Sequence, residues 1–165
     1  MAIRMIRQEG DPILRKISKP VKDITPRIEE LAQDLIDTMI DAEGAGLAAP
    51  QVGVLRRVVA VHFEDGPEVL INPEIVNEEG NYVDIEGCLS IEGFCATVAR
   101  PERLTVRYTT VDGEEKEKAV EMFFSKAVSH EVDHLNGILF RDKAIETVDP
   151  EEYQQRKEAE EQNED

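Results

Sequence analysis

Two histidines in the last third of the chain have the spacing of metal ligands. His130 and His134 flank Glu131 in the segment His-Glu-Val-Asp-His. Four residues of an α-helix correspond to about 400° of rotation, so both imidazoles would lie on one face, one turn apart. Both rings could then reach one cation, with the carboxylate of Glu131 beside it to transfer protons. The alternative is an amphipathic helix that contains two histidines by chance. The remaining histidine, His62, lies in an apolar strand and is expected to be structural or at the surface.

A catalytic divalent site usually has three protein ligands and one open position, so a third ligand is needed. Metzincin proteases place a histidine where this chain has Phe140, which excludes that class. Thermolysin-like enzymes use a downstream glutamate, and Glu151 and Glu152 stay open as candidates, although an acid-rich tail contains glutamates anyway. Cys88, in Glu-Gly-Cys-Leu-Ser, is the better candidate, because a thiolate with two imidazoles suits Zn²⁺ or Fe²⁺. Its alternative is a buried structural cysteine, and Cys95 is expected to be a core or surface thiol.

A segment of small residues from Gly44 to Gly53 could let a substrate backbone lie close to the chain. Within this segment, Gln51 could place a side-chain amide donor in the site. The alternative is a flexible connection between a helix and a strand, with Gln51 merely solvated.

Two helices with strands between them would position these residues. Thr25 and Pro26 predict the start of a first helix, whose apolar residues then follow 3.6-residue spacing. A second helix should cover 121–136 and carry the histidine pair. Four runs are strand-like, namely 57–63, 69–72, 104–109 and 116–122. The second run should end at Pro73, and an Asp-Gly turn joins the last two. This order predicts an α+β fold in which antiparallel strands pack around a C-terminal helix with the His-Glu-x-x-His motif.

The composition is typical of a soluble globular protein. The chain has 165 residues, of which 41% are hydrophobic and 33% charged. Its 36 acidic and 19 basic residues leave a net charge of −17, which disfavours direct binding to nucleic acid. No long apolar run and no secretion signal occur, so we expect a cytoplasmic protein without membrane association. Residues 1–148 are expected to form the catalytic domain and 149–165 an acidic C-terminal tail, solvated and partly helical or frayed.

Taken together, three segments resemble the signature motifs of the peptide deformylase family. They are G-x-G-x-A-A-x-Q at 44–51, E-G-C-L-S at 86–90 and H-E-x-D-H at 130–134, in the order and at about the spacing of that family. The similarity extends from Asp11 to about Lys143. The resemblance implies a deformylase-like α+β fold. It also implies a metal-dependent hydrolase that removes the formyl group from N-formylmethionyl nascent peptides and releases formate.

Carried onto this chain, the resemblance implies a role for each matching residue. Glu131 would be the general base and then the general acid, while Gln51 and the backbone N–H of Leu89 resemble the family's oxyanion donors. The cofactor would be one divalent metal ion, Fe²⁺ by resemblance, which Zn²⁺, Ni²⁺ or Co²⁺ can replace. Its ligands would be Cys88, His130 and His134.

The resemblance also places the substrate. The peptide would lie as an added strand against the glycine-rich segment and pair with backbone groups of Gly46. The substrate-binding residues would be Ala45, Gly46, Glu86, Gly87, Phe123 and Ala127. Glu86 and Arg100 are expected to form either a pair beside the pocket or a plain surface ion pair. Glu92 and Ser129 stand where the family usually has proline and glutamine. These departures concern the pocket rim and catalytic efficiency rather than the type of reaction.

The expected partner is an N-formylmethionyl peptide or nascent chain. Two alternatives stay open: a deformylase-like protein that acts on a different N-acyl group, and a metal-stabilised binding module without activity. Comparing the turnover of a formyl peptide with that of its acetyl analogue tests the first alternative. The variant Glu131→Gln tests the second, because a catalytic protein would lose its activity and keep its metal, whereas a binding module would be unchanged.

Overall fold

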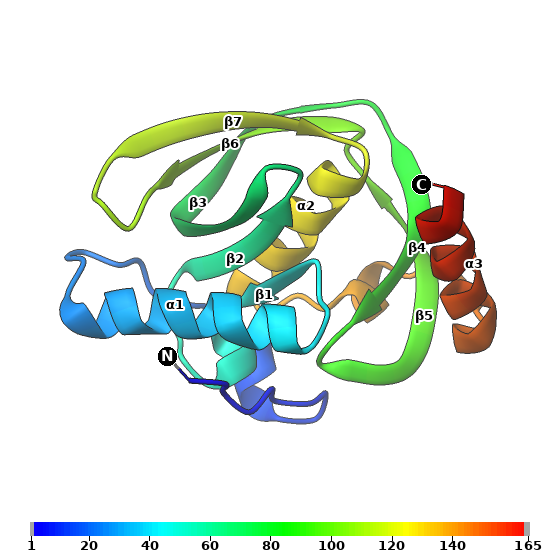
Figure 1. The fold of residues 1–165 in the computed structure, drawn as a ribbon, viewed down its shortest axis with the longest axis horizontal. Coiled ribbons are helices and arrows are strands. Elements are labelled where there is room, and N and C mark those ends of the chain that lie inside the picture. The colour runs from blue at the N-terminus through cyan, green and yellow to red at the C-terminus, as the bar shows by residue number, and fades with distance from the viewer. Residues whose placement is uncertain (1, 164–165) are drawn as a thin grey trace.

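Two antiparallel sheets and three α-helices make up the part of the chain that the structure describes, residues 2–163 of a computed structural model (Figure 1). The five-stranded sheet has the order β1-β2-β3-β6-β7, and the three-stranded sheet has the order β4-β5-β8. The strands are β1 Gly46–Ala48, β2 Val58–Phe63, β3 Gly66–Glu79, β4 Tyr82–Cys88, β5 Ile91–Arg100, β6 Arg103–Thr109, β7 Glu115–Glu121 and β8 Glu146–Val148. The helices are α1 Pro26–Asp41, α2 Phe123–Leu135 and α3 Pro150–Asn163.

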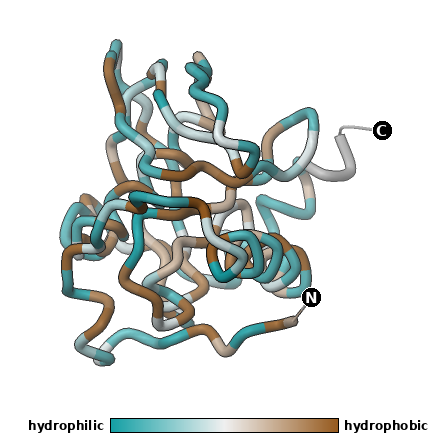
Figure 2. The backbone as a smooth tube through the Cα atoms, turned by 90° about the vertical axis from the view of Figure 1, so that its left-hand side faces the viewer, coloured by the Kyte–Doolittle hydropathy of each residue, from teal (hydrophilic) through white to brown (hydrophobic). Residues whose placement is uncertain are grey.

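The larger sheet lies between α1 and α2, and its strand β2 has an apolar face toward each of them. In β2, Val58 and Ala60 pack in the cluster that contains α1, while Val59 and Val61 pack in the cluster that contains α2. Figure 2 shows hydrophobic and hydrophilic residues interspersed along the backbone. Successive side chains of a strand point to opposite faces, so one strand can support both helices. The histidine motif on α2 is thereby held against a rigid sheet.

Both predicted helices form at the predicted places. Thr25 caps α1 by accepting a hydrogen bond from the backbone N–H of Ile28 at 3.4 Å, and Pro26 occupies the first turn. The first helix then buries Leu31, Leu35 and Met39, four residues apart, against the sheet. These are the cap and the periodicity that the sequence indicated. The second helix spans Phe123–Leu135, within the expected 121–136.

The prediction that the second strand ends at Pro73 was wrong, since β3 continues to Glu79. Proline cannot donate to a strand ladder, but it is tolerated where the ladder is already irregular. The register of β3 against β6 shifts between Ile71 and Glu74, and Asn72 has a positive φ of 52°. The side chain of Asn72 bonds both backbone groups of Val21 at 2.8 Å, which holds the irregular turn in place.

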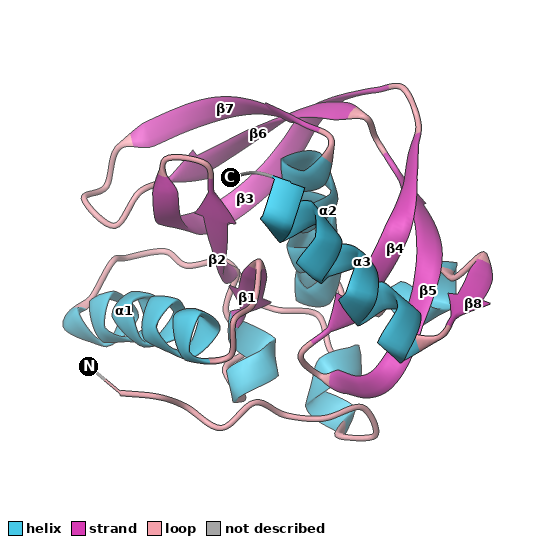
Figure 3. Cartoon of the chain, turned by 45° about the vertical axis from the view of Figure 1, so that its right-hand side comes forward, coloured by secondary structure: helices cyan, strands magenta, loops and turns pink. Residues whose placement is uncertain are grey.

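The smaller sheet supplies the cysteine. Strands β4 and β5 form a hairpin in which Cys88 pairs with Ile91, and the register is irregular just before it, between Glu86 and Cys88. The interruption falls at Gly87. In Figure 3, β4 and β5 pass beside α2 and α3. Within the described residues, none of the helices has the length and apolar character needed to cross a membrane.

Candidate metal centre and active site

The structure brings the thiol of Cys88 beside both imidazoles of α2. His134 Nε2 lies 3.4 Å from Cys88 Sγ and 3.2 Å from His130 Nε2. The three ligand atoms all lie within 4.8 Å of one another, and no other such group of His, Cys, Asp or Glu occurs among the described side chains, those of residues 2–160. Three donors this close to one another can share one small cation, because zinc–nitrogen and zinc–sulfur bonds are about 2.0–2.3 Å long.

A buried ion pair orients one of the two rings. His130 Nδ1 lies 2.7 Å from Glu86 Oε1, so its Nε2 faces the other two donors. Arg100 donates two hydrogen bonds to the Glu86 carboxylate, at 2.8 and 2.9 Å, and a third to Asp133 at 2.7 Å. The side chains of Glu86 and Arg100 are each 2% exposed, so this is the buried pair and not the surface alternative. A carboxylate behind a ligating histidine fixes its tautomer and raises its basicity.

Burial and charge act in opposition on this cluster. Burial alone would raise the pKa of Glu86, but hydrogen bonds from Arg100 and His130 outweigh it and lower the pKa to about 2. Burial also opposes the charged form of His130. The carboxylate of Glu131 and the contacts with Cys88 and Glu86 outweigh that effect, so the His130 pKa is raised well above its ordinary value. Burial lowers the pKa of His134 well below its ordinary value. A cation bound at the ring nitrogens would therefore compete with a proton on His130.

Glu131 lies next to Gly46 of strand β1. Its side chain is buried, and Oε1 has no hydrogen-bond partner among the described residues. Burial raises the pKa of Glu131 to about 7, which suits a group that transfers protons near neutral pH. A Cβ atom on Gly46 would lie only 2.6 Å from Glu131 Oε2 and 2.8 Å from Cγ. Glycine at position 46 therefore makes room for the carboxylate.

Gln51 is 1% exposed, so the alternative of a merely solvated side chain is wrong. Its Oε1 accepts a hydrogen bond from the Ala48 N–H at 2.9 Å, which fixes the amide orientation. Its Nε2 donates to Ser90 Oγ at 3.0 Å and lies 3.7 Å from Cys88 Sγ. The amide donor thus points toward the cysteine. Leu89 follows that cysteine directly in the chain.

A groove of about 690 Å³ opens onto these groups. Its lining includes Gln51, Leu89, Cys88, His130 and Glu131. Every residue that the sequence assigned to substrate binding also lines it, namely Ala45, Gly46, Glu86, Gly87, Phe123 and Ala127.

Several residues considered from the sequence lie outside the cluster. His62 is exposed at the groove, and Glu151 and Glu152 are exposed at the start of α3. Glu92 is exposed in β5, whereas Ser129 is buried in α2.

Among the groove residues that sequence reasoning missed, Tyr153 and Lys157 come from α3. The signal available was that Tyr153 is the only aromatic residue of the acidic tail, 149–165.

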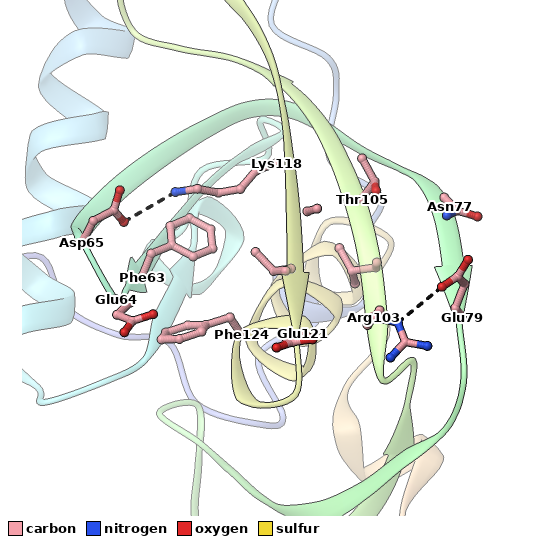
Figure 4. A pocket seen from close by; sticks show the side chains of 13 residues that line it. Phe63, Glu64, Asp65, Asn77, Glu79, Arg103, Thr105, Lys118, Glu121 and Phe124 are labelled. Carbon is pink, nitrogen blue, oxygen red and sulfur yellow. Dashed lines mark hydrogen bonds and ion pairs between the residues drawn. The ribbon is translucent and has the colours of Figure 1, made fainter. Parts of the chain in front are cut away.

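A second hollow, of about 730 Å³, lies between β2, β3, β6, β7 and the start of α2 (Figure 4). Phe63 and Phe124 form part of its apolar lining. Lys118 pairs with Asp65 at 3.6 Å and lies over the Phe63 ring, and Arg103 pairs with a glutamate on the opposite side. It contains no cysteine or histidine and none of the predicted site residues. It therefore lacks the metal-binding and acid–base groups of the first groove.

Comparison with known proteins agrees with this geometry. The family model described as polypeptide deformylase matches residues 3–150. The peptide deformylase of Acetivibrio thermocellus is 50% identical over 163 residues, covering 99% of this chain and 96% of that protein. That of Thermoanaerobacter pseudethanolicus is 49% identical over 158 residues, covering 96% and 99%. The crystal structure of the Thermotoga maritima enzyme superposes with a TM-score of 0.85 at 37% identity, covering 88% of this chain and 99% of that one. The predicted α+β fold is confirmed, and the chain belongs to the peptide deformylase family.

Proposed function

We propose that this protein is a metal-dependent hydrolase that removes the formyl group from N-formylmethionyl peptides and nascent chains. The observation that carries the proposal is the meeting of Cys88, His130 and His134 beside the buried carboxyl of Glu131, which lines an open groove. Family membership supports the same reaction.

The donor set fits one divalent cation. A thiolate and two imidazoles with converging donor atoms suit Fe²⁺ and Zn²⁺, and three protein ligands leave a position open. We propose Fe²⁺ from the resemblance to the family, with Zn²⁺, Ni²⁺ or Co²⁺ able to replace it. When bound there, such a cation would polarise the amide carbonyl and lower the pKa of a nearby water.

The protein groups then account for the proton transfers. Glu131 would accept a proton from the water as its oxygen attacks the formyl carbon. Gln51 Nε2 and the backbone N–H of Leu89 would donate hydrogen bonds to the developing oxyanion, and one such donor can contribute about 3–4 kcal/mol. Glu131 would pass its proton to the leaving nitrogen as the C–N bond breaks. The products are formate and a free amino terminus.

The sheet offers a place for the peptide. Strand β1 is at the edge of the five-stranded sheet, so one side of it is not paired with another described strand. An extended peptide can add to such an edge through its backbone, with Gly46 as its partner. The methionine side chain would then enter the part of the groove formed by Ala45, Glu86, Phe123 and Ala127.

We also propose a cytoplasmic location and no direct binding to nucleic acid. The net charge of −17 supports the second point, because a polyanion repels the phosphate backbone.

Formate release from formyl-Met-Ala-Ser by Fe²⁺- or Ni²⁺-loaded protein, measured beside the acetyl analogue, tests the reaction. We expect turnover of the formyl peptide and little of the acetyl peptide. The reverse preference would favour a different N-acyl substrate. Glu131→Gln should abolish turnover while the metal content stays unchanged. A variant as active as the wild type would remove Glu131 from the chemistry.

A further inference from the structure

The C-terminal helix α3 forms part of the active-site groove. Its sequence is polar along almost its whole length, and most of its side chains are exposed. Among the described side chains of α3, Tyr153 is the exception, because it is half-buried and lines the groove. Figures 1 and 3 both show α3 beside β4 and β5, and it contacts β5. The helix is therefore more than a solvated extension.

Tyr153 contacts the chain next to the cysteine. A Cβ on Gly87 would lie 3.3 Å from Tyr153 Cε2 and 3.7 Å from Cys95 Sγ, so the ring packs over the Gly87 backbone. Gly87 immediately precedes Cys88. Burial raises the Tyr153 pKa to about 12, so the ring stays neutral around pH 7. It thus provides an aromatic surface close to the proposed metal ligand.

Lys157 follows Tyr153 by one helical turn and lines the same groove. Its Nζ lies 5.3 Å from the centroid of the Tyr153 ring, within the range of a cation–π contact. Residues four apart share a helix face, so this pair is what α3 presents to the groove. Arg156, the neighbouring base, is exposed and does not line the groove.

The charge of Lys157 is available to a ligand. The other lysine of the groove, Lys126, is nearly buried and bonds Asp84 at 2.8 Å and the Ile85 carbonyl at 3.2 Å. Lys157 is exposed, and no ion pair joins it to a carboxylate within the described side chains. An anionic group of a peptide lying in the groove could pair with it.

We propose that Tyr153 and Lys157 bind the substrate peptide beyond its first residue, and that Lys157 favours an acidic side chain at the second or third position. The inference rests on the proposed function, because it requires the peptide to lie in this groove. Tyr153 would act by contact with the peptide backbone and by holding α3 in place, and Lys157 by charge.

The test compares formyl-Met-Ala peptides that carry Glu or Lys at the third position, and formyl-Met peptides that carry them at the second. All have an amidated C-terminus, so the side chain is the only carboxylate. We expect the wild type to prefer the Glu peptide of at least one pair by about two- to fivefold in kcat/KM, the size expected of one exposed charge pair. Lys157→Glu should reverse that preference, and high salt should weaken it. Arg156→Glu makes the same charge change outside the groove and should leave the preference unchanged.

The role of Tyr153 is tested separately, through the KM and kcat of its variants. Tyr153→Ala should raise KM for all the peptides with little change in kcat, and Tyr153→Phe should restore the wild-type KM because the ring makes the contact. Equal Glu-to-Lys ratios in wild type and Lys157→Glu would overturn the role of Lys157. Equal shifts in Lys157→Glu and Arg156→Glu would do the same, because they would show a general field effect.

Failure of the proposed reaction gives a different result. If no formyl peptide is turned over, binding of the unformylated Glu and Lys peptides by calorimetry tests the inference on its own. A Glu-over-Lys preference in Kd that Lys157→Glu reverses would support it, and equal Kd values or no binding would overturn it.

Discussion

Replacing Gly46 with alanine should remove most of the activity without unfolding the protein. The added Cβ would lie 2.6 Å from Glu131 Oε2, 2.8 Å from Cγ and 2.9 Å from Cδ. Favourable contacts between carbon atoms are about 3.5–4.0 Å long, so the carboxylate must move by roughly 1 Å. A shift of about 1 Å in a catalytic group can cost about 10²-fold in rate. We therefore expect kcat to fall about 10²-fold. The backbone of Gly46 does not have a positive φ, so alanine fits the strand itself.

The assay is formate release from formyl-Met-Ala-Ser, with metal content and thermal unfolding measured on the same preparation. Gly44→Ala is the matched control, because its Cβ would meet Leu89 Cδ1 at 2.8 Å, the end of a flexible side chain that can rotate away. We expect that variant to lose less than about tenfold, since only a side chain must adjust. A Gly46→Ala protein with kcat within threefold of the wild type would refute the reasoning. A loss of activity that is explained entirely by missing metal, or by a raised KM with an unchanged kcat, would refute it too.

Three further predictions concern the metal ligands and the buried ion pair. Cys88→Ala should lose both bound metal and activity, measured by elemental analysis and formate release, and full metal retention would contradict its role as a ligand. Chelation should abolish turnover, and Fe²⁺ or Ni²⁺ added anaerobically should restore it; unchanged activity in metal-free protein would contradict the mechanism. Arg100→Ala should lower the free energy of unfolding in urea by about 3–5 kcal/mol, because it removes the guanidinium that pairs with the buried carboxylate of Glu86. The pair of Arg107 with Glu117 is half-exposed, so Arg107→Ala should lower the free energy of unfolding by less than about 1 kcal/mol. Equal losses of unfolding free energy in the two variants would contradict this comparison.

Features that depend on neighbouring residues could be predicted from the sequence. The cap at Thr25, the apolar period of α1 and the one-turn spacing of His130 and His134 follow from helix geometry alone. The three motifs also indicated the family, which the comparisons show. The cap, the helical period, the histidine spacing and each motif involve residues that are close together in the sequence. Over such short distances, backbone geometry determines which side chains are neighbours.

Features that depend on distant residues required the tertiary structure. Cys88 and His134 are 46 residues apart, and only the packing of β4 against α2 places their atoms 3.4 Å from each other. No local pattern decided between a buried and an exposed Glu86–Arg100 pair, because burial depends on the whole fold. Strand β3 continues past Pro73 because contacts from Asn72 to Val21 stabilise the irregularity.

The acidic tail shows the same division most clearly. Its composition predicted a solvated segment, partly helical or frayed, and the helix α3 spans Pro150–Asn163. Only the fold turns Tyr153 toward Gly87 and brings Lys157 to the groove. The sequence therefore determined which chemical groups this protein has and how neighbouring ones are spaced. Their meeting around one site was decided by long-range packing, which no short segment of the chain encodes.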